Sequence, residues 1–198
     1  MCWPPNPTTM SADKYELLRQ SVIDAPVVMK GEYAYFIHPL SDGVPSQSAE
    51  LLSAARDLIF EKVDWNNVDL ILGIEAMGIP LATALSLKSG KPLVVGRKRP
   101  YGLPGEFAIN QTTGYSKGEI YLNDINKDDK VFIVDDVVST GGTLLPILNA
   151  IDTMGAVVSD CWIIFEKGDG MKNIRKSGNW PLNSLVKIEM INNKVSLL

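Results

Sequence analysis

The segment Val131–Leu148 constrains the fold of this chain more than any other. It begins with four apolar residues, passes through two adjacent carboxylates, Asp135 and Asp136, and continues as a loop of glycine and hydroxyl side chains into a helical pattern. A short apolar run rich in β-branched residues predicts a strand that is buried on both faces in a parallel sheet. The segment therefore predicts a strand, a turn and a helix, the repeating unit of an α/β fold.

The loop between this strand and this helix has the composition of a phosphate site. Its residues are Ser139, Thr140, Gly141, Gly142 and Thr143. Two glycines let the backbone approach a phosphate, and successive N–H groups and small hydroxyls can donate to it at the helix N-terminus. Pro146 falls in the first helical turn, where a missing N–H is tolerated. We expect the neighbouring Asp135 and Asp136 to hold ribose hydroxyls or a hard cation such as Mg²⁺.

Neither of the common glycine motifs of nucleotide-binding proteins is present. The chain lacks both Gly-x4-Gly-Lys-Ser/Thr and Gly-x-Gly-x-x-Gly. The order found here is four apolar residues, two acids, a short spacer and Thr-Gly-Gly-Thr. It resembles the phosphoribosyl-diphosphate (PRPP) motif of the type I phosphoribosyltransferases. In the alternative, the two acids only cap the helix of an ordinary strand–turn–helix, but further segments that agree with the family favour the PRPP motif.

Length, charge and cysteine content restrict the class of protein. The 198 residues predict one α/β domain with small additions. With 19 Lys and Arg against 23 Asp and Glu, the chain has no general attraction to nucleic acid, so any anion site must be local. No apolar stretch is long enough to span a membrane, and the N-terminus lacks a signal-peptide pattern, which predicts a cytoplasmic protein without a membrane partner. Cys2 and Cys161 lie far apart, so neither a disulfide framework nor a zinc site is expected.

Alternating helix and strand patterns cover most of the chain. Helices are expected at 11–25, 48–62 and 79–87, and strands at 68–74, 92–95, 120–122, 131–134 and 160–165. The predicted fold class is therefore α/β, with a central, mostly parallel sheet flanked by helices. Residues 1–10 are expected to form a flexible tail, and 11–198 a single domain. Within it, residues 26–46 contain a predicted hairpin that the resemblance identifies as a hood over the site, and 185–198 are expected to form a C-terminal hairpin.

The loop after the strand 68–74 is a second segment that matches the family. Glu75, Ala76, Met77 and Gly78 should lie at the same sheet edge as Asp135, because ligands gather at the carboxyl ends of parallel strands. The loop resembles the diphosphate-binding loop of adenine-type members, with Met77 where the family carries arginine. Backbone N–H groups would then replace a cationic contact. An ordinary strand-to-helix turn explains these residues equally well.

Three consecutive cations, Arg97, Lys98 and Arg99, follow the next strand. Cations at this place can stabilise the charge that develops on a departing diphosphate. The order Arg97-Lys-Arg-Pro-Tyr-Gly-Leu-Pro-Gly105 resembles a family pattern, which implies that one or two of the three contact diphosphate. The alternative is a solvated surface cluster.

The segment 98–118 is expected to be a long loop, and residues 102–117 resemble the mobile catalytic loop of the family. Closure of such a loop excludes water and so prevents hydrolysis of PRPP. Adenine-type members often carry a glutamate before Tyr-Gly in this loop, whereas Gly114 stands in that place here, which leaves the acid/base group open. Tyr115 and Lys117 are the candidates to contact the transition state.

Two aromatic residues are candidates for contact with a base. Phe36 lies in the predicted hood and Phe165 ends the strand 160–165, and the resemblance implies that both regions lie beside the base. Either ring could stack on a purine. Alternating aromatic residues in a hairpin are more often core residues, however, and the lone His38 is expected to be structural.

Over residues 15–170 the motifs together resemble the archaeal hypoxanthine/guanine branch of the family. The resemblance implies a pentosyltransferase of purine salvage whose substrates are PRPP and a purine base and whose products are a nucleoside 5′-monophosphate and diphosphate. It implies Asp135, Asp136, Lys98 and Arg99 as catalytic residues, Mg²⁺ held by the aspartates directly or indirectly, and a homodimer. Adenine, xanthine or orotate as the acceptor, a weakly active enzyme, and a PRPP-binding regulator without catalysis remain alternatives.

Overall fold

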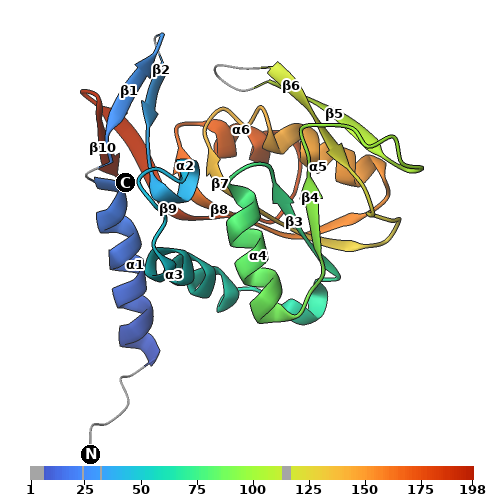
Figure 1. The fold of residues 1–198 in the computed structure, drawn as a ribbon, viewed down its shortest axis with the longest axis horizontal. Coiled ribbons are helices and arrows are strands. Elements are labelled where there is room, and N and C mark those ends of the chain that lie inside the picture. The colour runs from blue at the N-terminus through green and yellow to red at the C-terminus, as the bar shows by residue number, and fades with distance from the viewer. Residues whose placement is uncertain (1–6, 24, 32, 113–116) are drawn as a thin grey trace, which may run out of the picture.

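The computed structural model describes residues 7–23, 25–31, 33–112 and 117–198, and its centre is a six-stranded sheet (Figure 1). The strands of this sheet are β3 (Leu70–Ile74), β4 (Leu93–Gly96), β7 (Lys130–Val138), β8 (Val157–Lys167), β9 (Leu182–Ile191) and β10 (Lys194–Leu197). Their order is β10-β9-β8-β7-β3-β4, and every neighbouring pair is parallel except β9 and β10. The predicted fold class, a mostly parallel sheet flanked by helices, is confirmed.

Helices cover both faces of this sheet. They are α1 (Pro7–Ile23), α2 (Pro39–Asp42), α3 (Ala49–Phe60), α4 (Gly78–Ser89), α5 (Leu144–Thr153) and α6 (Gly170–Ser177), with a 3-10 turn at Trp65–Asn67. Side chains of β7 alternate between two cores: Phe132 packs with Leu58 and Leu81 of α3 and α4, whereas Ile133 packs with Leu148 of α5. This strand is therefore buried on both faces, as its apolar run predicts.

Two antiparallel hairpins stand over the carboxyl ends of the central strands. One consists of β1 (Val27–Lys30) and β2 (Tyr33–Phe36), and the other of β5 (Phe107–Thr112) and β6 (Lys117–Leu122). In Figure 1 the first rises at the upper left of the sheet and the second at the upper right. Residues of β2 and Gln111 of β5 line the cavity described below.

The second hairpin corrects the prediction of a long loop at 98–118. Residues 107–112 of that segment form a strand, and the expected strand 120–122 pairs with it rather than with the central sheet. Ile109 is buried between two exposed neighbours, which is the alternation of a strand, and it packs in the core with Ile120. The many Gly, Pro and Thr residues nearby hide this alternation in the sequence. Backbone hydrogen bonds between Arg97 and Tyr121 join the hairpin to the end of β4.

The two ends of the chain differ in detail from the predicted elements. Helix α1 begins at Pro7, inside the segment predicted as a tail, while residues 1–6 lie outside the described part. The C-terminal hairpin turns at Asn192 and Asn193, both of which have positive φ angles. Its first strand, β9, starts earlier than expected and joins the central sheet beside β8. None of the described helices is long and apolar enough to span a bilayer.

His38 is structural, as its sequence context predicts. Its Nδ1 accepts the Leu40 N–H at 3.1 Å and so caps α2, and its Nε2 lies 3.0 Å from the Ser21 hydroxyl. Burial lowers the pKa of His38 from 6.5 to about 4, so the ring is neutral at pH 7. Cys161 is a buried free thiol, and burial raises its pKa.

Candidate functional site

The carboxyl ends of β3, β4, β7 and β8 meet at a cavity of about 280 Å³, closed on one side by β2. This is the sheet edge where an α/β fold gathers its ligands. Most of the candidate residues from the sequence line it: Phe36, Glu75, Ala76, Met77, Lys98, Asp135, Asp136, Ser139, Thr140, Gly141, Gly142 and Thr143. Segments more than 100 residues apart in the sequence are thus brought to one place.

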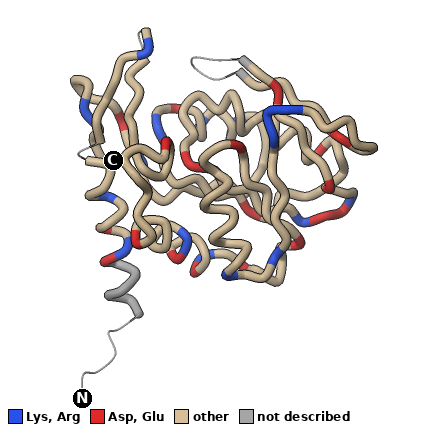
Figure 2. The backbone as a smooth tube through the Cα atoms, in the orientation of Figure 1, with Lys and Arg blue, Asp and Glu red and all other residues tan. Residues whose placement is uncertain are grey.

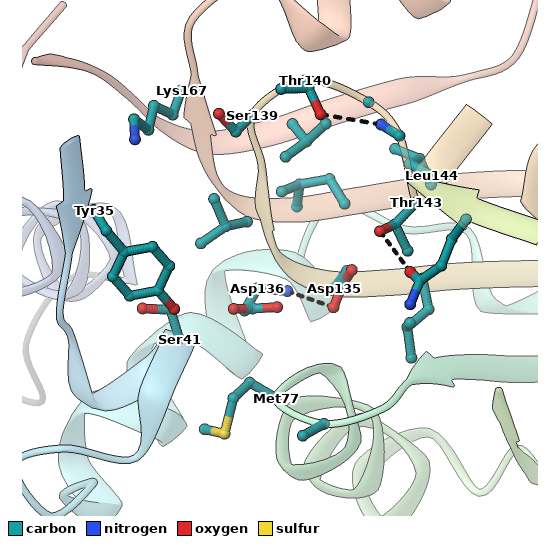
Figure 3. A pocket seen from close by; sticks show the side chains of 18 of the residues that line it. Tyr35, Ser41, Met77, Asp135, Asp136, Ser139, Thr140, Thr143, Leu144 and Lys167 are labelled. Atoms are coloured by element: carbon teal, nitrogen blue, oxygen red, sulfur yellow. Dashed lines mark hydrogen bonds between the residues drawn. The ribbon is translucent and has the colours of Figure 1, made fainter. Parts of the chain in front are cut away.

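Asp135 and Asp136 point into the middle of the cavity (Figure 3). They lie inside β7, which continues to Val138, and not beyond the end of a strand as expected. The Asp136 N–H donates to Asp135 Oδ1 at 3.0 Å. Burial raises the pKa of Asp135 to about 6, and burial together with the neighbouring charge of Asp135 raises the pKa of Asp136 well above its usual value. The pair is therefore short of compensating positive charge, which a metal ion or a cationic ligand centre could supply.

The loop Ser139–Thr143 curves around the upper side of the cavity before α5 begins. Gly141 has a φ of +83°, a left-handed conformation that suits glycine. The Gly142 N–H donates to Thr140 Oγ1 at 3.3 Å. Two further contacts come from the hairpins, because Tyr33 donates its hydroxyl to Ser139 Oγ and Thr143 donates its own to Gln111 Oε1, both at 2.9 Å. The loop is thus held from both sides.

Gly170, the first residue of α6, supports the same loop from below. Its N–H donates to the Ser139 carbonyl oxygen at 2.9 Å. A Cβ added to Gly170 would lie 2.3 Å from that oxygen and 2.9 Å from the Gly141 nitrogen. Only a glycine allows this close approach of two backbones.

The loop after β3 and the cations after β4 are tied to each other. The Glu75 carboxylate accepts the Lys98 N–H at 3.0 Å and forms an ion pair with Arg97 Nε at 3.1 Å. Glu75 therefore positions the cationic segment, and its negative charge does not suit direct contact with diphosphate. Lys98 lines the cavity, whereas Arg99 is exposed and contacts Tyr101. In Figure 2 the three cations 97–99 form a continuous blue segment at the end of β4. On the rest of the backbone, Lys and Arg are interspersed with Asp and Glu.

Gly78 does not line the cavity but shapes it from behind. It opens α4, and a Cβ there would lie 2.9 Å from Asp135 Oδ1 and 3.0 Å from the Val134 carbonyl oxygen. The glycine therefore lets helix α4 begin directly against the catalytic candidate Asp135. Met77, next to it, presents its side chain to the cavity below the two aspartates (Figure 3).

Of the two candidates for contact with the base, Phe36 lines the cavity and Phe165 does not. Phe165 is fully buried and packs edge-on against Phe36 and His38, so its ring does not face the cavity in this structure. Phe36 lines the cavity with little exposed surface. Of the loop candidates, Tyr115 lies outside the described residues, and so does the side chain of Lys117.

Lys167, Gln111 and Gly170 are site residues that the sequence did not identify. Lys167 closely follows the candidate Phe165, but Gln111 carries no recognisable signal in its neighbours. The side chain of Lys167 is 7% exposed and lines the cavity. Its Nζ donates to the Ala34 carbonyl oxygen and lies 3.9 Å from the centre of the Tyr33 ring. No carboxylate among the described residues lies within ion-pair distance of it.

The two aspartates are chemically suited to a hard cation such as Mg²⁺, provided that other groups supply most of its ligands. Among the described residues, no group of three or more His, Cys, Asp or Glu side chains could enclose a metal ion. Mg²⁺ in phosphate-transfer sites is commonly held by one or two carboxylates, with the remaining ligands from phosphate oxygens and water. Asp135 and Asp136 supply two such carboxylates, and both line the cavity.

Comparison with known proteins gives consistent results. Residues 47–184 match the family model described as phosphoribosyl transferase domain. The hypoxanthine/guanine phosphoribosyltransferase of Ferroglobus placidus is 50% identical over 181 residues, which cover 91% of this chain and 96% of that protein. The Methanotorris igneus protein of the same name is 46% identical over 182 residues, covering 92% and 100%.

Solved structures support the same fold. The crystal structure of adenine phosphoribosyltransferase from Rhodothermus marinus has a TM-score of 0.71 at 23% identity and covers 89% of this chain and 99% of that one. The corresponding structure from Thermoanaerobacter pseudethanolicus also has a TM-score of 0.71, at 22% identity, and covers 87% of this chain and 99% of that one. At these identities the likeness concerns the fold alone.

Proposed function

The chain belongs to the phosphoribosyl transferase domain family, and we propose that it transfers the phosphoribosyl group of PRPP to hypoxanthine or guanine. The products are the nucleoside 5′-monophosphate and diphosphate. The observation that carries the proposal is one cavity in which a glycine-rich loop, two adjacent carboxylates and Lys98 face one another. Relatives of nearly equal length that bear the hypoxanthine/guanine name support the choice of purine.

In this proposal each side of the cavity takes one part of PRPP. The loop Ser139–Thr143 holds the 5′-phosphate through N–H groups and hydroxyls. Asp135 and Asp136 hold the ribose hydroxyls and stabilise the positive charge that develops on the ribose as the bond from C1′ to the diphosphate oxygen breaks. Lys98, held in place through Glu75, stabilises the departing diphosphate. A new bond then joins C1′ to the base nitrogen, whose proton passes to the departing diphosphate or to water.

We also propose Mg²⁺ as the cofactor, with Asp135 and Asp136 as its protein ligands, directly or through water. When bound, the ion neutralises diphosphate charge and orients the ribose. The raised pKa values of both aspartates are consistent with a site completed by a cation. A cytoplasmic location and a homodimer remain predictions from the sequence.

Lys167 offers a physical reason for a 6-oxopurine. An ammonium group has three N–H donors and no acceptor, and among the described residues it donates one hydrogen bond, to the Ala34 carbonyl oxygen, and lies over the Tyr33 ring. Hypoxanthine and guanine both present an acceptor oxygen at C6, whereas adenine presents an amino donor there. A buried ammonium on the hood side of the cavity therefore favours the oxopurines, because leaving donors facing donors is costly.

Diphosphate release with PRPP and Mg²⁺ against hypoxanthine, guanine, xanthine, adenine and orotate tests the function. We expect release that depends on hypoxanthine or guanine and is at least about tenfold faster than with adenine. Release with orotate alone would replace the purine assignment. Calorimetric binding of PRPP without release on any base would instead indicate a regulator.

Replacing Lys167 with methionine tests how the base is selected. We expect kcat/KM for hypoxanthine and guanine to fall about 10- to 100-fold, the loss that follows when a hydrogen bond to a charged group is removed, with little change for adenine. Lys172→Met, on the exposed face of α6, is the matched control and should leave all rates unchanged. An equal loss with every base would place Lys167 at the ribose phosphate instead.

A further inference from the structure

The two hydroxyl side chains at the ends of the glycine-rich loop are held by the two hairpins in opposite ways. Ser139 accepts a hydrogen bond from Tyr33, on the hood hairpin β1–β2. Thr143 donates its hydroxyl proton to Gln111, on the hairpin β5–β6. The second bond is the dashed line at Thr143 in Figure 3. A hydroxyl has one proton, so the direction of each bond decides what it can still offer a ligand.

A phosphate group accepts hydrogen bonds from its surroundings. Ser139 can donate to a phosphate while Tyr33 stays in place, because its own proton is not used in that bond. Thr143 has given its proton to Gln111 Oε1 and can donate to a phosphate only if that bond is broken. The two contacts therefore respond differently to an arriving phosphate.

The side chain of Gln111 is suited to follow this change. It is 8% exposed, lines the cavity, and sits on β5 opposite Gly118 of β6. Its amide carries an acceptor oxygen and a donor nitrogen on the same carbon. Rotation of the amide presents Nε2 to Thr143 Oγ1, so the contact persists while the Thr143 proton turns to the phosphate.

We propose that Gln111 is a positioning residue for the PRPP 5′-phosphate, acting through Thr143, and that it links phosphate occupancy to the hairpin β5–β6. The inference rests on the proposed function, which assigns the 5′-phosphate to this loop. As a consequence, a hydrogen bond between Gln111 and Thr143 holds the hairpin against the site with and without phosphate. Gln111 Oε1 accepts this bond when the loop is empty, and Gln111 Nε2 donates it when phosphate is bound.

Two isosteric substitutions separate this role from a structural one. Gln111→Glu supplies only acceptors and a negative charge, so the carboxylate and the phosphate compete for the single hydroxyl proton of Thr143. Calorimetry should give a Kd for ribose 5-phosphate raised about 10- to 100-fold, while the Kd for diphosphate, bound near Lys98, changes less than about twofold. Gln111→Met releases the Thr143 proton, so that Kd should stay within about threefold, while kcat falls up to about tenfold because the hairpin loses its hold.

Matched variants separate the shared proton from a general effect of charge near the loop. Asn110→Asp places the same charge change on the adjacent, exposed position of β5 and should leave the Kd for ribose 5-phosphate unchanged. In a Thr143→Val background, Gln111→Glu should add less than about threefold, because the shared proton is gone. This double variant also carries the test if one single variant folds poorly.

Equal losses of ribose 5-phosphate affinity in the Glu and Met variants would overturn the inference, as would wild-type affinity in the Glu variant. A wild-type protein that binds diphosphate but no ribose 5-phosphate would instead overturn the phosphate assignment of the proposed function, and with it this role of Gln111. Binding of ribose 5-phosphate by the wild-type protein, with a larger loss of affinity in Gln111→Glu than in Gln111→Met, supports both the phosphate assignment and the role of Gln111.

Discussion

Replacing Asp135 with asparagine will lower kcat by about 10²- to 10³-fold and will stabilise the folded protein at neutral pH. The loss of rate is expected because the carboxylate charge faces the ribose, where positive charge develops. The gain in stability has a separate cause. Asp135 is 9% exposed, and burial raises its pKa from 3.8 to about 6, so its ionised form is costly in the folded state. The neutral amide removes a cost of about 1–3 kcal/mol.

The pH dependence of stability gives a second readout of the same substitution. Between pH 3.8 and about 6 the folded protein binds this proton and the unfolded chain does not, so the free energy of unfolding falls as pH rises. In Asp135→Asn this contribution to the slope disappears, which urea unfolding at several pH values measures. Asp160→Asn, in β8 and outside the cavity, is the control and should keep kcat within about twofold. A wild-type rate in Asp135→Asn would remove this residue from the mechanism.

Gly170→Ala is expected to weaken the binding of ribose 5-phosphate strongly, although residue 170 does not line the cavity. The new Cβ would lie 2.3 Å from the Ser139 carbonyl oxygen and 2.8 Å from its carbon, both backbone atoms that no rotamer change can move away. The loop must therefore shift. A shifted loop loses one or two N–H hydrogen bonds to the charged phosphate, so the Kd for ribose 5-phosphate should rise about 100-fold. Diphosphate binding should persist.

A glycine at a helix end elsewhere provides the control for this variant. Gly90 has a φ of +74° and ends α4, and a Cβ added to it would meet no other side chain or backbone atom within 4 Å. Gly90→Ala should cost about 1 kcal/mol of stability through backbone strain and leave ribose 5-phosphate binding unchanged. If both variants lose the same affinity, the effect of Gly170→Ala is global destabilisation and the support role is wrong.

Local chemistry makes the central part of the site predictable from the sequence. The apolar run before Asp135 and the glycines after Val138 each have a direct physical requirement, namely burial on both faces and a close approach of backbone. The rule that ligands gather at the carboxyl ends of parallel strands also places Glu75 and Lys98 correctly beside this segment. These residues carry their information within a few neighbours.

Residues that act through distant contacts cannot be found in this way. Gln111 is a site residue only because β5 folds back over the start of α5, and nothing in its neighbours indicates that. The sequence makes Phe165 a candidate because aromatic rings suit a purine, and it does not single out the Lys167 side chain. The structure buries the ring beneath Phe36 and leaves the ammonium at the cavity. Local pattern does not reveal which of two nearby side chains tertiary packing will cover.

The position of β3 in the sheet has a consequence for the synthesis of the chain. This apolar strand, Leu70–Ile74, is paired on one side by β4, which follows it closely, and on the other by β7, Lys130–Val138. As the polypeptide leaves the ribosome, one edge of β3 stays unpaired until Val131–Val134 of β7 have emerged. An unpaired apolar edge is prone to join other chains. The apolar edge of β3 is thus exposed until just before the phosphate loop that follows β7 emerges.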